Sequence, residues 1–173
     1  YGCYFLKMLM QQRKGIRTDQ IGQGKVGFVK FVEVTMKIAT LLVPAAEVIS
    51  ILLNTTCFLA LFRICGAVIG ALGAAVFVTS VVTMRDSWRA GGSKTVTDGI
   101  YQISRNPAFL GFDLVYIGIL LMFFNPWLLA ASAFAMLMFH LQIVNVEEDF
   151  LLETFGQEYL AYKKKVNRYI GRK

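Results

Sequence analysis

Four long apolar stretches dominate the hydrophobic pattern of the chain. They cover residues 31–53, 57–82, 108–124 and 127–146. Each approaches or exceeds the roughly 17 to 25 residues that a helix needs to cross a hydrocarbon core about 30 Å thick. Lipid offers the backbone no hydrogen-bond partners, so these stretches are predicted to be helices. The pattern therefore predicts an all-α polytopic membrane protein with about four transmembrane helices.

Short polar breaks arrange these helices as two hairpins, residues 31–82 and residues 108–146. Residues 54–56 form a tight connection in the first hairpin, and Asn125-Pro126 separates the two helices of the second. Asn106-Pro107 and Asn125-Pro126 each place an N-cap asparagine before a proline at the first helical position. Consecutive helices are therefore expected to run antiparallel, and the last two to lie side by side.

The second apolar stretch carries a face of small residues. Gly66, Gly70 and Gly73 recur on it at spacings of three and four residues, with alanines beside them. Small residues let two helix backbones approach closely inside a membrane. This face is predicted to pack against another helix and to take no part in chemistry.

Composition and charge support a membrane protein and orient it. Hydrophobic residues make up 56% of the chain and charged residues only 17%, which is too apolar for an ordinary soluble domain. Of the 18 lysines and arginines, six lie in residues 7–30, four in 85–105 and six in 163–173, all on one side of the predicted spans. The positive-inside rule makes that side cytoplasmic. The net charge of +7 is thus assigned to topology and anionic lipid, with no nucleic acid as partner.

The chain is predicted to be a single integral membrane domain, residues 1–173. Residues 1–10 are apolar but too short to span, which favours the end of a further N-terminal helix or an interfacial segment. Near the C-terminus, Gly156 is expected to separate two short amphipathic helices. The predicted units are an N-terminal segment and cytoplasmic arm (1–30), a first hairpin (31–82), a cytoplasmic loop (83–107), a second hairpin (108–146) and cytoplasmic C-terminal helices (147–173).

Candidate chemistry gathers on the cytoplasmic side. The predicted helix start at Pro107 offers unpaired N–H groups to an anion, and Arg105 beside it offers a fork for a carboxylate or phosphate. The two helices of the second hairpin bring Glu147 and Glu148 back to this side, where they suit an ammonium group or hydroxyls. This combination favours a zwitterionic ligand. The three cysteines have no metal-ligand spacing, so no metal site is predicted.

Two ionisable residues lie within the last two spans. Asp113 sits about two turns into its helix, and His140 lies seven residues before Glu147. Burying such groups in a membrane is costly, which makes them candidates for function. Two interpretations stay open: Asp113 pairs with His140 as a structural contact, or it lines the path of a substrate.

Five short motifs follow one another along the second half of the chain. They are Val96-Thr97-x-Gly99-x-Tyr101, Arg105-x-Pro107, Asn125-Pro126, Glu147-Glu148 and Phe155-Gly156-x-Glu158-Tyr159-x-x-Tyr162. These motifs and their order resemble the isoprenylcysteine carboxyl methyltransferase family, which is related to the membrane phospholipid methyltransferases. The resemblance covers roughly residues 84–170, and Asn106 and Phe109 depart from the histidine and tyrosine that are usual in the family.

The resemblance implies S-adenosylmethionine as methyl donor and a lipophilic acceptor that enters from the bilayer, such as a prenylated cysteine carboxylate. It implies catalytic roles for Arg105, Glu147 and Arg168. Tyr101 suits a cation–π contact with the sulfonium. The implied cofactor-binding residues are Val96, Gly99, Tyr101, Asn106, Pro107, Glu147 and Glu148.

Three alternatives stay open beside a methyltransferase for isoprenylcysteine carboxylate. A phospholipid amine N-methyltransferase needs a base, for which Glu147 and Glu148 are candidates, whereas a carboxylate acceptor needs none. An NADPH-dependent membrane reductase shares an Arg-x-Pro helix start. A membrane protein without enzymatic activity would use the basic face to bind lipid or a partner.

Overall fold

The computed structural model describes residues 9, 13, 26–54, 60–84 and 96–173. Cys3, Cys57, all of residues 1–10 except residue 9, and most of the arm expected at 11–30 lie outside these residues, so the predictions for them are not tested. The long helices are α2 (Gly27–Leu52), α3 (Ala60–Met84), α4 (Pro107–Met122), α5 (Pro126–Gln142) and α6 (Glu148–Lys165). A short 3₁₀ helix, η2 (Gly99–Gln102), precedes α4, and a π-helix, η3 (Ile143–Glu147), joins α5 to α6. The predicted all-α class is confirmed.

Among the described residues, three helical segments are long and apolar enough to cross a membrane. They are α2, α3 and the continuous helix Pro126–Lys165, which joins α5, η3 and α6. At 1.5 Å per residue, the 30 residues before a kink at Gly156 rise about 45 Å, more than the thickness of a hydrocarbon core, so the charged α6 extends beyond it. The apolar α4 has 16 residues and rises only about 24 Å. The chain is a multi-pass membrane protein.

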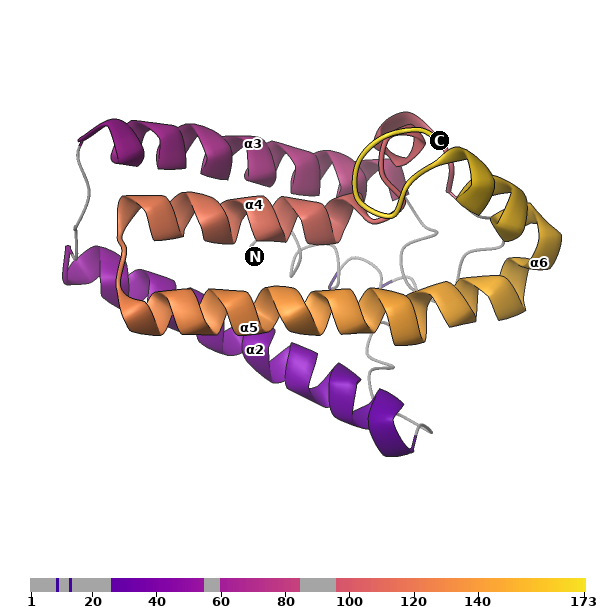
Figure 1. Cartoon of the computed structure of the whole chain (residues 1–173), viewed down its shortest axis with the longest axis horizontal. Coiled ribbons are helices and arrows are strands. Elements are labelled where there is room, and N and C mark those ends of the chain that lie inside the picture. The colour runs from indigo at the N-terminus through magenta and orange to yellow at the C-terminus, as the bar shows by residue number, and fades with distance from the viewer. Residues whose placement is uncertain (1–8, 10–12, 14–25, 55–59, 85–95) are drawn as a thin grey trace.

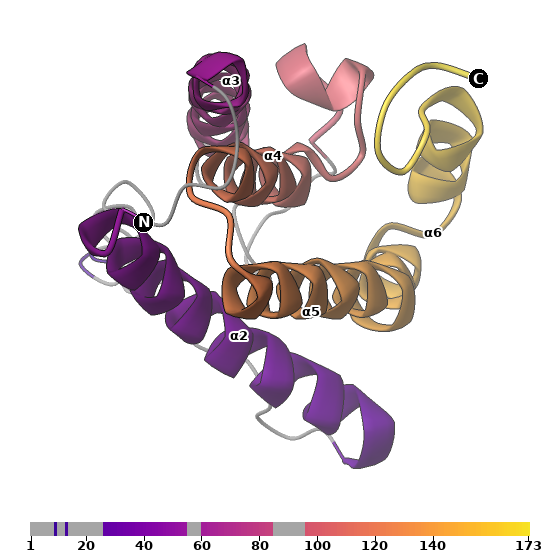
Figure 2. The ribbon, with the colours of Figure 1, turned by 60° about the vertical axis from the view of Figure 1, so that its left-hand side comes forward.

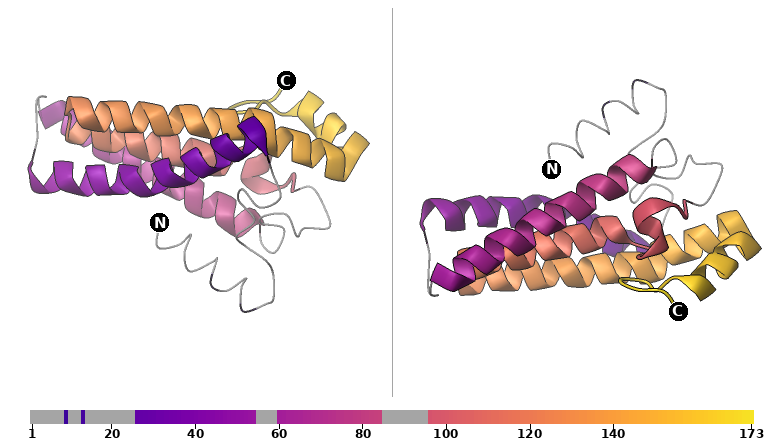
Figure 3. Two further views of the ribbon diagram at one scale, coloured as in Figure 1. Left: turned by 90° about the horizontal axis from the view of Figure 1, so that it is seen from below. Right: turned by 90° about the horizontal axis from the view of Figure 1, so that it is seen from above.

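Helix packing differs from the expected arrangement in the first of the two hairpins. Consecutive helices do run antiparallel, but within the described residues α2 and α3 barely touch. The main contacts join α3 to α4 and α2 to α5, and α4 meets α5 over a smaller area. Figures 2 and 3 show α3 stacked along α4, with α2 crossing α5 obliquely. The predicted side-by-side packing of α4 and α5 in the second hairpin is confirmed, whereas the helices of the first hairpin, α2 and α3, run antiparallel but pack mainly against other helices.

Glycines bring the backbones of α3 and α4 into direct contact. A Cβ atom added to Gly66 would lie 2.5 Å from the carbonyl oxygen of Gly118, and one added to Gly73 would lie 2.7 Å from that of Gly111. Such distances leave no room for any side chain. The small-residue face predicted on α3 is thus confirmed as a packing surface. It packs against two glycines of α4, Gly111 and Gly118.

An apolar core and polar contacts hold the remaining helices. Phe139 on α5 lies at the centre of the core, with ring centroids 5.2 to 6.0 Å from those of Phe109, Phe112 and Tyr116 on α4. At the opposite end of the bundle from α6, the side chain of Asn125 accepts a hydrogen bond from the Leu128 N–H (2.8 Å), the predicted N-cap. The buried core residues shared by α2, α4 and α5 are Met36, Ala39, Val43, Tyr116, Ala135, Met138 and Phe139.

A kink at Gly156 folds α6 back toward η2. Gly156 has φ +50° and ψ −119°, a conformation essentially restricted to glycine. Figure 1 shows the helix turning at this point, so that its second half returns to the beginning of α4. The predicted division of this segment at Gly156 is confirmed. We call this end of the bundle, where α4 begins and α5 ends, the site end.

Replacement of Gly156 by alanine is expected to destabilise the folded-back half of α6. No atom lies within 4 Å of the added Cβ, so the cost comes from the backbone alone and should be about 1–3 kcal/mol. The measurement is the thermal unfolding midpoint of the detergent-purified protein. Glu153→Ala, an exposed change on the same helix, is the control. Equal midpoints for both variants would show that the kink does not depend on glycine.

Candidate functional site

A single carboxylate, that of Glu148, organises the site end. Glu148 begins α6 and is only 5% exposed. Arg168 Nε donates to its Oε1 (2.8 Å) and Arg168 Nη2 to its Oε2 (3.3 Å). Lys163 Nζ lies 2.7 Å from Oε2, and Arg105 Nη1 lies 3.1 Å from Oε1. Three cations from separate parts of the chain thus share one buried carboxylate, and we call these four residues the Glu148 cluster.

Arg105 is the most deeply buried cation of the Glu148 cluster. Its side chain is 5% exposed, compared with 32% for Arg168 and 40% for Lys163. Besides contacting Glu148, its Nη1 donates to the hydroxyl of Tyr159 (2.8 Å), and the guanidinium lies 5.9 Å from the centre of that ring. Its Nε has no hydrogen-bond partner among the described residues. Arg105 therefore keeps one buried donor that the described protein does not use.

The charge of Glu148 is fixed by its surroundings. Burial would raise the pKa of Glu148, but hydrogen bonds from Arg168 and Lys163 and the charge of Arg105 lower it from 4.5 to about 2. Glu148 is therefore ionised at neutral pH. With three cations around one carboxylate, the Glu148 cluster carries an excess of positive charge.

Tyr101 lies on η2 against the folded-back helix. It is 4% exposed, and its carbonyl oxygen accepts a hydrogen bond from the hydroxyl of Tyr162 (2.6 Å). Burial raises the pKa of Tyr101 to about 12, and the nearby charge of Glu147 also raises it. Tyr101 is therefore a neutral phenol at physiological pH. The effect of Glu147 on this pKa places the first glutamate of the pair near the Tyr101 side chain.

The backbone N–H groups of the two residues before α4 are already bonded within the protein, and anion binding by the first turn of α4 itself stays a prediction. The N–H of Arg105 donates to the carbonyl of Asn167 (3.1 Å), and the N–H of Asn106 donates to Ser104 Oγ (3.1 Å). Pro107 occupies the first helical position as predicted. Asn106 is the N-cap residue of α4, as predicted, but its side chain makes no capping hydrogen bond. Its Nδ2 donates instead to the carbonyl of Arg168 (3.1 Å).

Gly99, the first residue of η2, packs against the end of α3, and Val96 lies three residues before it. Gly99 has φ +56°, and a Cβ there would lie 3.2 Å from the Thr83 side chain on α3. Its left-handed backbone and close packing both favour glycine. Val96 is half-buried at the beginning of this segment. Gly99 therefore positions Tyr101, and a direct cofactor contact by Val96 or Gly99 stays a prediction.

Residues 166–173 form a C-terminal strap across the site end, seen as the yellow loop beside the C label in Figure 1. Its ends pair in an antiparallel bridge between Val166 and Arg172. The hydroxyl of Tyr169 lies 2.5 Å from His140 Nδ1, and the two rings stack. Burial, followed by the charge of Asp113, raises the pKa of Tyr169, so Asp113 lies near this tyrosine. The proposed partner of Asp113, His140, is thus bound to Tyr169.

The structure brings most of the predicted site residues to one end of the bundle. Arg105, Glu148 and Arg168 meet directly, Tyr101 and Glu147 lie close to each other, and Asn106 contacts the Arg168 backbone. Sequence reasoning missed the ion pair of Lys163 and the hydrogen bond between Arg105 and Tyr159. The spacing of Tyr159, Tyr162 and Val166 on one helical face was the available signal, since all three are buried.

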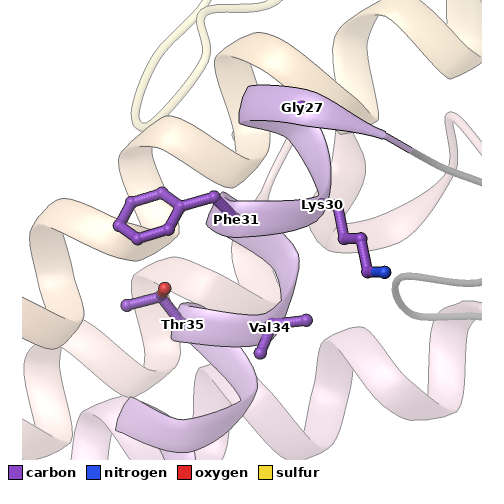
Figure 4. Close-up of a pocket in the computed structure, with 5 residues that line it drawn as sticks. All are labelled: Gly27, Lys30, Phe31, Val34 and Thr35. Carbon is purple, nitrogen blue, oxygen red and sulfur yellow. The ribbon is translucent and has the colours of Figure 1, made fainter.

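A groove of about 330 Å³ also lies on the surface of α2 (Figure 4). All of its lining residues come from the first part of this helix, and none belongs to the predicted site. Its lining is mainly apolar, which suits a surface that faces lipid. The lining residues are Gly27, Lys30, Phe31, Val34 and Thr35.

Comparison with known families decides how this geometry is interpreted. The phospholipid methyltransferase family matches residues 61–158, which is more than half of the chain. The chain belongs to the phospholipid methyltransferase family. Within this family match lie Arg105, Glu147 and Glu148, whereas Lys163 and Arg168 follow it.

Several curated proteins that are similar to this chain are protein-S-isoprenylcysteine O-methyltransferases. The enzyme of Saccharomyces cerevisiae is 41% identical over 71 residues, covering 41% of this chain and 30% of the relative. Enzyme B of Arabidopsis thaliana is 37% identical over 75 residues, 42% of this chain and 37% of the relative. The Dictyostelium discoideum enzyme is 35% identical over 71 residues, 41% of this chain and 30% of the relative. The chain thus matches about a third of the length of these relatives.

Proposed function

We propose that the protein is an S-adenosylmethionine-dependent methyltransferase that methylates a lipophilic acceptor at the cytoplasmic face of a membrane. The observation that carries this proposal is the Glu148 cluster around buried Arg105, within a chain of a methyltransferase family. The similarity to isoprenylcysteine O-methyltransferases favours an isoprenylcysteine carboxylate as acceptor. The family favours methyl transfer over the NADPH-dependent reduction that the sequence left open.

The residues of the site fit S-adenosylmethionine. Its amino-acid end carries a carboxylate, which suits the unused Nε–H of Arg105 and the positive excess of the Glu148 cluster. Its ammonium group suits Glu147. Tyr101, a neutral phenol, offers an aromatic face to the sulfonium. Asn106, Pro107 and Gly99 would shape the surrounding backbone.

The cofactor supplies an activated methyl group when it is bound, so the protein needs no strong base for a carboxylate acceptor. The chain's residues bind and align the reactants and exclude water. Arg105 holds a carboxylate at a fixed, buried position because Glu148 and Tyr159 restrain its guanidinium. Arg168, whose side chain is 32% exposed, would help to neutralise the acceptor carboxylate as it arrives from the membrane surface.

The orientation of the site toward the cytoplasm is part of the proposal. The cations of the segment 163–173 lie at the site end, on α6 and the C-terminal strap. Positive charge gathers on the cytoplasmic side of membrane proteins. An isoprenylcysteine carboxylate would then place its lipid tail in the inner leaflet and its carboxylate near the Glu148 cluster.

A phospholipid amine is a second candidate acceptor. Asp113 Oδ1 is buried and has no hydrogen-bond partner among the described residues, although Tyr169 of the C-terminal strap lies near this side chain. Such an oxygen favours a ligand with N–H donors over a carboxylate. For an amine acceptor, Glu147 would serve as the base. The name of the family that matches the chain also fits this acceptor.

Replacement of Arg105 by glutamine is expected to weaken binding of S-adenosylmethionine about 10- to 100-fold, because a charge-assisted hydrogen bond is worth roughly 1.5–3 kcal/mol. Calorimetric titration of the detergent-purified protein measures this. Arg63→Gln is the matched control, since Arg63 lies at the opposite end, where its Nη2 donates to Asn54 Oδ1 (2.8 Å). Equal affinity of the two folded variants for S-adenosylmethionine would show that Arg105 does not contribute to its binding.

Transfer of a radiolabelled methyl group to two acceptors tests the reaction. We expect methylation of N-acetyl-S-farnesylcysteine and none of phosphatidylethanolamine. The reverse result would establish the amine as acceptor. A folded protein that binds no S-adenosylmethionine would contradict both forms of the proposal.

A further inference from the structure

The C-terminal strap is anchored to the segment that carries Arg105. The N–H of Gly171 donates to the carbonyl of Ile103 (2.8 Å), and Arg172 Nη2 donates to Gln102 Oε1 (2.6 Å). The N–H of Arg105 donates in turn to the carbonyl of Asn167 (3.1 Å). The C-terminal strap and residues 102–105 are thus bound to each other from both sides.

The side chain of Asn106 adds a hydrogen bond to the C-terminal strap at Arg168, the residue of the strap that belongs to the Glu148 cluster. Its Nδ2 donates to the carbonyl oxygen of Arg168 (3.1 Å), and Ser104 Oγ approaches the same oxygen at 3.5 Å. Asn106 is 9% exposed, so this bond is shielded from water. The amide donor carries no charge and keeps its hydrogens at every pH at which the protein is folded.

This bond fixes the backbone from which the Arg168 side chain reaches Glu148. The Arg168 guanidinium is 32% exposed and has a long, flexible stem, so its position depends on where its backbone is held. The two residues therefore form a continuous connection from the first turn of α4, through the carbonyl of Arg168, to both oxygens of Glu148.

We propose that Asn106 is a positioning residue, which holds Arg168 in the geometry that the Glu148 cluster needs and does not itself touch the ligand. The inference rests on the proposed function and replaces a direct cofactor contact by Asn106 with an indirect one. It also identifies the chemical requirement at this position, a neutral N–H two bonds from Cβ. Histidine satisfies the same requirement through Nδ1–H, whereas aspartate offers only acceptors.

Binding of S-adenosylmethionine to Asn106→Asp, Arg168→Gln and the double variant tests the inference. Each single change is expected to weaken binding about tenfold, the effect of roughly 1.4 kcal/mol, and the double variant is expected to bind no more weakly than Arg168→Gln. Asn106→His is expected to keep most of the affinity. Asn54→Asp, the same substitution at the opposite end, is the control.

Hydrogen exchange without ligand provides a second measurement. Asn106→Asp should speed exchange of the Gly171 and Arg105 amides, which bond the C-terminal strap to its support, and Asn106→His should not. Losses of affinity that multiply in the double variant, or an Asn106→His variant as weak as Asn106→Asp, would overturn the inference while leaving the proposed function intact. A folded wild-type protein that binds no S-adenosylmethionine would instead overturn the proposed function.

Discussion

Replacement of Glu148 by glutamine is expected to lower the thermal unfolding midpoint sharply and to weaken binding of S-adenosylmethionine. The change preserves the shape of the side chain but removes the charge that three cations share. Arg105, whose side chain is 5% exposed, would then be a buried cation without a counterion. Breaking a buried ion pair in this way costs about 3–5 kcal/mol.

The acid dependence of this effect has a defined direction. The pKa of Glu148 is lowered from 4.5 in the unfolded chain to about 2, so its ionised form stabilises the folded protein fully above about pH 4.5. This stabilisation is lost as the pH falls toward 2. Unfolding midpoints of wild type and Glu148→Gln should therefore differ most near neutral pH and converge in acid.

Asp149→Asn is the matched control for Glu148→Gln. It removes a carboxylate from the next residue of α6, which is exposed to solvent. Its free energy of unfolding should stay within about 0.5 kcal/mol of wild type, as is usual for surface changes, so its midpoint should hardly move. If Asp149→Asn destabilised the protein as much as Glu148→Gln, the effect would belong to the helix terminus and not to the Glu148 cluster.

Replacement of Gly66 by alanine is expected to separate α3 from α4. The added Cβ would lie 2.5 Å from the Gly118 carbonyl oxygen and 2.8 Å from Met122 Cγ, so the helices must shift. Overpacking of this kind costs about 1–3 kcal/mol. The unfolding midpoint of the detergent-purified protein should fall accordingly.

Gly70 offers a control on the same face of the same helix. A Cβ there would meet its nearest atom, Gly118 Cα, at 4.0 Å, an ordinary contact. Gly70→Ala should be neutral or slightly stabilising, because alanine favours a helix by about 1 kcal/mol over glycine. Similar midpoints for the Gly66 and Gly70 variants would contradict the backbone contact between α3 and α4.

The membrane helices could be predicted because the bilayer restricts the chain so strongly. Apolar stretches of this length have no alternative to helical structure, and their bounds differ from the structure by only a few residues. The first predicted membrane helix begins at Gly27, four residues before the predicted Phe31, because the glycines of the preceding arm indicated a loop there. The fourth continues into a π-helix that no local pattern indicated.

The pairing of helices could not be predicted from the same pattern. An apolar helix presents similar surfaces to lipid and to protein, so hydrophobicity alone does not select a neighbour. Glycines gave the relevant signal on both helices. Gly66 and Gly73 on α3 are seven residues apart, as are Gly111 and Gly118 on α4, and only the first pair was interpreted as a packing face.

Within the candidate site, the sequence indicated the individual groups but not how they bind one another. Glu147 and Glu148 were expected to meet a ligand because no cation lies near them in the sequence. The cations of Glu148 come from 15, 20 and 43 residues away in the chain. The direction in which the chain folds back at Gly156 brings two of them into contact, and a single glycine does not reveal that direction.

The π-helix between α5 and α6 also affects how sequences of this kind should be aligned. A π-helix accommodates an extra residue within a helix, and each residue of an α-helix turns the chain by about 100°. The π-helix takes up the 100° turn of one extra residue, so a homologue with one residue fewer between Gln142 and Glu148 can continue as a regular α-helix and still present its paired acids to Arg105. A one-residue gap across Ile143–Glu147 in an alignment is thus compatible with a shared site.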